Sequence, residues 1–310
     1  MTMTNVSAAP MSGADPRTLA TREKASLKDA NGKAVKSKDR HTVNWPLTIV
    51  LAVLSLVILV PLYFTLVTAL KTPATVGGFD WPSKMHWENF STAAQMVDLG
   101  HVAFNSLIIT VAAVVLTLMT NTFVAYAVAR NQDKKFFRFL YFFFIAAMFV
   151  PFQVLMLPLA KQMGMLHLDN RIGLIILYVI FGLGTNLFIA TAFINSIPFS
   201  LEEAARIDGA GTWKIFFTII MPLMGPINAT IAITTTLWAW NDFLMPLIVM
   251  TDASNTTIPL AQYVFSSQFA TNYPVAFSSY LMAMLPVLVV YVISQKWVIS
   301  GVMRGAVKGE

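Results

Sequence analysis

Six long stretches without a single Asp, Glu, Lys or Arg side chain constrain this chain more than any other feature of its sequence. They cover residues 45–70, 102–129, 139–160, 172–201, 215–241 and 274–295. A helix needs about 20 apolar residues to cross roughly 30 Å of hydrocarbon, and each stretch supplies them. With 56% hydrophobic and 12% charged residues, the 310-residue chain has too little polar surface for a soluble globule. The sequence therefore predicts an all-α integral membrane protein with six transmembrane helices.

The distribution of basic residues predicts the orientation of these helices, because cytoplasmic loops carry an excess of Lys and Arg. If the N-terminus lies inside, 17 of the 21 basic residues fall on the cytoplasmic side. The other side holds only Lys71, Lys84, Lys161 and Arg171. We therefore expect a multi-pass protein with both termini in the cytoplasm. The net charge of +6 then reflects the excess of basic residues in the cytoplasmic segments, and no nucleic-acid partner is expected.

The chain divides into three parts by composition. Residues 1–44 are polar and Lys-rich without apolar periodicity, which predicts a disordered basic cytoplasmic tail. Residues 45–299 form the predicted six-helix membrane domain, and residues 300–310 a cytoplasmic C-terminal tail. The first apolar stretch starts too late and runs too long for a secretory signal peptide.

A polar island at residues 196–222 separates the fourth predicted span from the fifth. Ser200 followed by Glu203 has the spacing of a capping box, in which two side chains satisfy free backbone donors at a helix start. Gly209 then interrupts the helical pattern, and Pro222 opens the next apolar segment. These residues predict a short helix outside the bilayer, on its cytoplasmic side. An ordinary amphipathic interfacial helix is the simpler alternative.

Catalysis by this chain is not expected. The sequence has no nucleotide-binding G-x-x-x-x-G-K-[ST] motif, so a partner must handle any ATP. It has no cysteine and no H-E-x-x-H motif, and its four histidines fall in predicted tails or loops, so neither thiol chemistry nor a metal site is expected. Asp242 is the one acid placed within a predicted span.

The island also carries a longer pattern: Glu203, Ala204 and Ala205, then Gly209, then Ile219 and Pro222. This spacing resembles the EAA motif of ABC importer permeases, with Met221 in place of the usual Leu. The resemblance implies a coupling helix, between the fourth and fifth spans, that docks on an ATPase subunit. Its expected ATPase-coupling residues are Glu202, Glu203, Ala204, Ala205, Asp208, Gly209 and Ala210.

Weaker patterns elsewhere resemble the carbohydrate, maltose-type members of that family. They include the Asn241–Leu247 segment and a Gly-rich C-terminus in which Arg304 and Lys308 would face the ATPase. The resemblance implies a bacterial inner-membrane permease for a sugar or oligosaccharide. It further implies a second permease subunit, an extracytoplasmic solute-binding protein, and two ATPase subunits that hold ATP and Mg. This chain itself is expected to bind no cofactor.

Three polar residues, within the apolar stretches or directly after one, are candidates for a translocation path: Asn121, Asn241 and Asp242. Helix packing is the competing explanation for Asn121, and hydration or a hydrogen bond to Asn241 the competing explanation for Asp242. Rival functions also stay open at this stage. They are an importer of another solute such as a polyamine or phosphate, a secondary carrier or channel that works without ATP, and a membrane receptor or scaffold.

Overall fold

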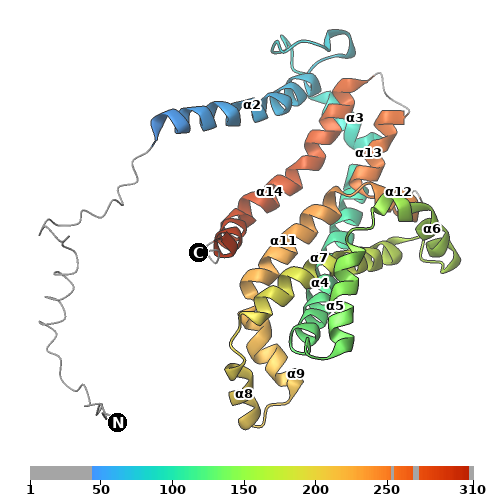
Figure 1. Cartoon of the computed structure of the whole chain (residues 1–310). Helices are drawn as coiled ribbons and strands as arrows, with labels where there is room; N and C mark the ends of the chain where they lie inside the picture. The colour runs from blue at the N-terminus through green and yellow to red at the C-terminus, as the bar shows by residue number, and fades with distance from the viewer. Residues whose placement is uncertain (1–43, 253–254, 268–271, 307–310) are drawn as a thin grey trace, which may run out of the picture. The chain divides into compact units, whose positions relative to one another are not determined.

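The computed structural model describes residues 44–252, 255–267 and 272–306. Every regular element in these ranges is a helix (Figure 1), which confirms the all-α prediction. The longer helices are α2 (Trp45–Ala69), α3 (Glu88–Met96), α4 (Leu99–Ala129), α5 (Lys135–Ala147), α6 (Phe152–Met165), α7 (Arg171–Asn195), α8 (Ser200–Ile207), α11 (Gly225–Asn241), α13 (Ile258–Ser267) and α14 (Tyr273–Ala306). The short ones are η1 (Pro73–Thr75), α9 (Thr212–Ile215), the π-helix η2 (Phe216–Ile220), α10 (Met221–Leu223) and α12 (Leu244–Val249).

Four of the described helices are long and apolar enough to cross a membrane: α2, α4, α7 and α14. The third and fifth predicted spans are instead bent pairs of helices. α5 and α6 meet at 104° beside Pro151, and the α9–α10 segment meets α11 at 74°. Proline disfavours a helical residue before it, so a break before Pro151 is expected. The count is six spans only if each bent pair crosses once, and it stays a prediction.

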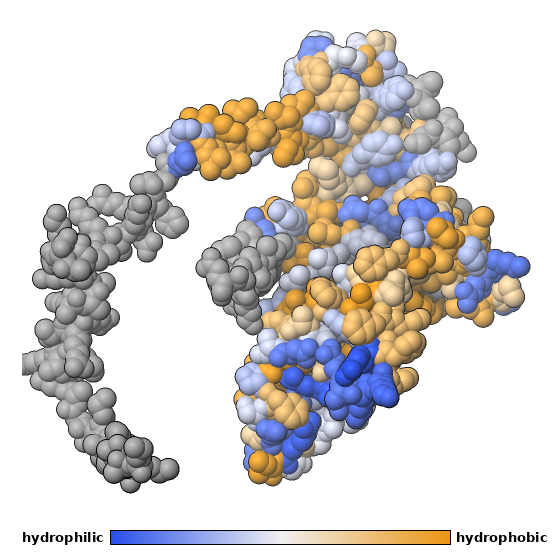
Figure 2. Space-filling model, in the orientation of Figure 1, coloured by the Kyte–Doolittle hydropathy of each residue, from blue (hydrophilic) through white to orange (hydrophobic). Residues whose placement is uncertain are grey.

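The described part of the chain divides into two units between Leu59 and Val60. Helix α2 contains the boundary, and its residues before Val60 are exposed and almost entirely apolar. In the second unit, Val67, Thr68 and Ala69 at the end of α2 are buried. Apolar side chains also cover much of the visible surface of the other helices (Figure 2). Such a surface is stable in contact with hydrocarbon and unfavourable in water.

The centre of the second unit is the pair α4 and α7, and α11 packs along α4. Three buried clusters surround this pair. One joins α4 and α7 to α9, η2 and α11, a second joins them to α6 and α12, and a third joins α4 to α3, α13 and α14. The polar island is therefore attached to the same two helices that form the middle of the bundle.

Candidate functional site

The island begins with α8. The prediction that a capping box of Ser200 and Glu203 starts this helix is wrong. Ser200 is the first helical residue rather than the N-cap, and Phe199 before it already has helical backbone angles of φ −64° and ψ −26°. The N–H groups of Leu201 and Glu202 bond to the carbonyls of Pro198 and Phe199, at 3.3 and 2.9 Å. These three-residue turns satisfy donors that a side-chain cap would otherwise satisfy.

The end of α8 matches the prediction, since Gly209 stops the helix. Its φ of +81° lies in the left-handed region that favours glycine. The N–H of Gly209 bonds to the carbonyl of Arg206 at 3.0 Å, and the N–H of Ala210 to that of Ala205 at 2.9 Å. This pair of bonds is the Schellman motif, which closes a helix and turns the chain sharply.

Glu202 is the structural anchor of α8. Its side chain is fully buried, whereas Glu203 beside it is exposed. The Tyr126 hydroxyl donates to Oε2 of Glu202 at 2.8 Å, and the Arg130 Nε donates to Oε1 at 2.6 Å. Tyr126 and Arg130 lie one turn apart at the end of α4, so both oxygens of one carboxylate bind a single helix. A buried carboxylate is stable only when paired and hydrogen-bonded in this way.

Two arginines and a phenylalanine extend this network. Arg130 also donates from Nη2 to the carbonyl of Ile197 at 3.2 Å, and Arg206 reaches Glu202 Oε2 at 3.5 Å. Both guanidinium groups lie over the ring of Phe199, at 5.6 and 5.2 Å from its centroid. These cation–π contacts hold the entry of α8 against α4.

A second, aromatic attachment joins the other half of the island to α4. Phe123 stacks on Phe216 with centroids 4.3 Å apart and meets Trp213 edge-on at 5.2 Å. A cavity of about 440 Å³ lies between the two attachments, with Tyr126, Arg130, Arg206 and Trp213 in its wall. The island is thus fixed to one helix at two places, one ionic and one aromatic.

The predicted coupling residues divide between the two faces of the island. Glu202 points inward, Ala205 and Ala210 are half-buried, and Glu203, Ala204, Asp208 and Gly209 are exposed. Ile207 and Trp213 on the same segment are 86% and 68% exposed. Large apolar side chains at this exposure among charged neighbours indicate a surface that a partner or the membrane interface covers.

The three predicted path residues lie in different surroundings. Asn121 is buried on α4, where its carbonyl oxygen accepts a bond from the Thr120 hydroxyl at 3.2 Å and its amide nitrogen has no partner among the described residues. Asn241 is exposed and donates back to the carbonyl of Leu237 at 2.7 Å.

Asp242 corrects a sequence prediction. It is not within the fifth helix, because α11 ends at Asn241 and the backbone of Asp242 is extended at φ −74° and ψ 131°. Its carboxylate accepts bonds from the Tyr178 hydroxyl and the Leu244 N–H, both at 3.1 Å. The second bond forms an Asx turn that leads into α12. Tyr178, and not Asn241, is therefore the side chain that holds this acid.

Lys71, which the sequence predicts only as a basic residue on the external side, takes part in a buried polar contact. Its side chain is buried just after the end of α2, where Nζ donates to the Gly78 carbonyl at 2.8 Å and lies 3.4 Å from Asp80 Oδ2. Asn89 donates to the carbonyls of Ala69 and Lys71, both at 2.9 Å. No local sequence pattern signals this arrangement, because its partners lie up to 20 residues away.

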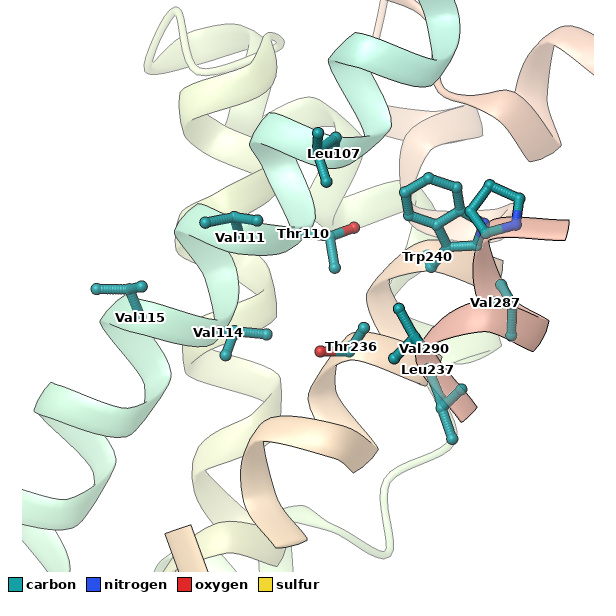
Figure 3. Close-up of a pocket in the computed structure, with 11 residues that line it drawn as sticks. Leu107, Thr110, Val111, Val114, Val115, Thr236, Leu237, Trp240, Val287 and Val290 are labelled. Carbon is teal, nitrogen blue, oxygen red and sulfur yellow. The ribbon is translucent and has the colours of Figure 1, made fainter. Parts of the chain in front are cut away.

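An apolar cavity of about 320 Å³ lies between α4, α11 and α14 (Figure 3). Figure 3 shows Val111, Val114 and Leu107 of α4 on one side and Trp240 and Val287 on the other. Its few polar groups include Thr110, whose hydroxyl has no partner among the described residues. A lining of this kind suits hydrocarbon and offers a polar solute almost nothing.

Known proteins resemble this chain over most of its length. A family model described as "binding-protein-dependent transport system inner membrane component" matches residues 121–304. The multiple sugar-binding transport system permease protein MsmG of Streptococcus mutans is 36% identical, over 88% of this chain and 100% of the relative. The melibiose/raffinose/stachyose import permease protein MelC of Bacillus subtilis is 34% identical, over 89% of this chain and 100% of the relative.

A solved structure is similar as well. It is the crystal structure of a bacterial ABC transporter involved in the import of the acidic polysaccharide alginate, and it matches with a TM-score of 0.69 at 25% identity. The match covers 80% of this chain and 94% of that one. The family model spans more than half of the residues, and the relatives are permeases rather than enzymes. The chain therefore belongs to the binding-protein-dependent transport system inner membrane components, among the permeases of carbohydrate ABC importers.

Proposed function

We propose that this chain is one of two membrane-spanning subunits of an ATP-driven importer for a sugar or oligosaccharide. An extracytoplasmic binding protein delivers the solute, and two partner ATPase subunits hold ATP and Mg and hydrolyse the ATP. The names of the relatives support the solute class. MsmG is named for a multiple sugar-binding transport system, and MelC for the import of melibiose, raffinose and stachyose. A further solved structure of similar fold is a bacterial alginate ABC transporter in complex with a periplasmic protein that carries an alginate pentasaccharide.

The observation that carries the coupling mechanism is the attachment of the island to α4. Because both oxygens of Glu202 bind α4, a force on the exposed face of α8 reaches α4 without first bending the loop. Glu203, Ala204, Asp208 and Gly209 are the residues of that face which we assign to ATPase docking. In this proposal the island lies in the cytoplasm, as do both termini.

The C-terminus is assigned a second contact with the ATPase subunits. Arg304 lies in the last turns of α14 by its backbone, and Lys308 lies outside the described residues. The disordered tail predicted for residues 1–44 also falls outside the described residues, apart from Asn44.

Two cavities beside α7 fit a neutral sugar better than an acidic one. The residues that line them, at the break between α5 and α6 and between α7 and α11, carry no ionisable side chain. An anionic solute would be concentrated by Lys or Arg in such a position. We therefore propose an uncharged carbohydrate, in contrast to the alginate handled by the solved relative.

The first test is purification of the tagged chain from its native membrane in mild detergent, followed by mass spectrometry. The expected result is recovery of a second permease and an ATPase, together with a binding protein when sugar is present. Radiolabelled raffinose should then enter vesicles that contain this assembly only when ATP is supplied. Recovery of the chain alone, with import driven by an ion gradient, would instead establish a secondary carrier.

A further inference from the structure

A small cavity of about 210 Å³ lies between α7 and α11. Hydrogen-bonding side chains form a larger share of its lining than in the mainly aliphatic cavity of Figure 3. The lining residues are Phe181, Gly182, Thr185, Asn186, Thr234, Thr235 and Trp238. Polar groups on the surface of membrane helices are unfavourable toward lipid, so this face is expected to meet water or protein.

Trp238 is held in place while part of its indole stays accessible. It meets the ring of Tyr178 edge-on, with centroids 5.2 Å apart, and Tyr178 is fixed in turn by its hydrogen bond to Asp242. The side chain remains 37% exposed. It also lines a larger cavity of about 590 Å³ at the break between α5 and α6, so it forms a wall shared by two cavities.

Gly182 lets two amide groups converge behind the small cavity. A Cβ atom added to this glycine would lie 3.1 Å from the Asn186 amide nitrogen and 3.8 Å from both the Asn121 amide nitrogen and the Trp238 ring. The Asn121 nitrogen is buried and has no partner among the described residues. An unsatisfied buried donor of this kind is unfavourable, and an acceptor beside Gly182 would satisfy it.

We propose that Trp238, Asn186, Thr185 and Thr234 form a subsite that binds one sugar ring as the solute crosses this subunit. A pyranose ring presents apolar C–H groups on its face and hydroxyls around its edge, which match an indole beside amides and hydroxyls. The cavity is smaller than the roughly 300–1,000 Å³ that enclose a drug-sized ligand, so it holds one ring rather than an oligosaccharide. This inference rests on the proposed function and adds that the subunit touches its solute.

The test compares import of radiolabelled melibiose and raffinose with ATP hydrolysis, using the complete transporter with its binding protein in lipid vesicles. The informative quantity is the number of sugar molecules imported per ATP hydrolysed. In Trp238→Ala we expect this ratio to fall about five-fold, because the variant loses the aromatic face on which the sugar ring would stack. Trp238→Phe keeps a ring and should recover most of the ratio.

Two further variants separate the subsite from a general packing defect. Asn186→Leu keeps the side-chain volume but removes the amide, and it should lower the ratio about three-fold or more, the loss of one hydrogen bond. Gly182→Ala should raise the KM for sugar, because its methyl group crowds the Asn186 amide. Phe188→Ala is the matched control, an exposed aromatic residue on α7 outside both cavities, and should keep the unsubstituted ratio.

Three outcomes would overturn the subsite while leaving the importer intact. The first is an unchanged ratio in both Trp238→Ala and Asn186→Leu, which would assign the cavity to lipid or to the partner permease. The second is an equal fall in Phe188→Ala. The third is a loss in Trp238→Phe as large as that in Trp238→Ala. If the unsubstituted assembly imports neither sugar and hydrolyses no ATP, the proposed function itself fails, and the subsite with it.

Discussion

Glu202 and Glu203 are adjacent and chemically alike, yet the structure places them in opposite surroundings. Glu202 is buried between Tyr126 and Arg130, whereas Glu203 faces outward on the first turn of α8. The difference follows from helical geometry, since neighbouring residues point about 100° apart. One residue thus stabilises the segment, and the next is available to a partner.

Removing the buried charge should destabilise the protein. Glu202→Gln leaves Arg130 without its carboxylate, and breaking one partner of a buried ion pair costs about 3–5 kcal/mol. We expect about 3 kcal/mol here, because Arg130 keeps some exposure. Thermal unfolding of the detergent-purified protein measures the loss.

The matched control for this experiment is Glu203→Gln, which should change stability by at most about 0.5 kcal/mol because its side chain is exposed. Adding Arg130→Gln to Glu202→Gln should restore part of the loss, since the remaining arginine of the network, Arg206, is exposed and can be solvated. Equal Tm values for Glu202→Gln and Glu203→Gln would show that the ion pair is not the anchor.

At the scale of helices, local sequence patterns predicted several elements, whereas contacts between residues far apart in the chain could not be predicted. The apolar stretches predicted α2, α4, α7 and α14, and Gly209 predicted the end of α8. The capping-box prediction failed because Phe199, which packs under Arg130 and Arg206, already adopts helical backbone angles. The partner of Glu202 lies 76 residues earlier in the chain, so no spacing rule in the island could identify it.

The docking role that we propose for α8 leads to a prediction about coupling. Glu203→Lys reverses an exposed charge at the start of the helix, where a carboxylate is favoured by the helix dipole. We expect the chain to insert and assemble, with sugar import reduced about ten-fold relative to ATP hydrolysis, the size of a 1.4 kcal/mol change in docking. Glu203→Gln removes the charge without reversing it. Its sugar import relative to ATP hydrolysis should lie between those of Glu203→Lys and the unsubstituted protein. Import by Glu203→Lys at the normal rate would contradict the assignment.

At the scale of the whole molecule, the number of membrane crossings depends on the two bent pairs. If α5 with α6 crosses once, its two ends lie on opposite sides of the membrane, and the same holds for the α9–α10 segment with α11. A helix pair that re-enters would return to the side from which it came. The polar loops on each side therefore distinguish four crossings from six.

Single cysteines provide this test, because the natural chain contains none. Five exposed residues are each replaced by cysteine in a separate variant: Lys84, Asp133, Lys161, Lys214 and Thr251. With six crossings, a membrane-impermeant maleimide should label Lys84→Cys, Lys161→Cys and Thr251→Cys in intact spheroplasts. It should label Asp133→Cys and Lys214→Cys only after permeabilisation. Labelling of Lys161→Cys only after permeabilisation would show that α5 and α6 re-enter.

The two oxygens of Glu202 also determine which motions α8 can make. They are held by Tyr126 and Arg130, which lie one turn apart along α4, so the two attachment points define a line along that helix. A body fixed at two points keeps one rotational freedom, about the line that joins them. Displacement of α8 along this axis must carry α4 with it, whereas rotation of α8 about the axis is restrained by the contact of Arg130 with Phe199 and by the stack of Phe123 on Phe216.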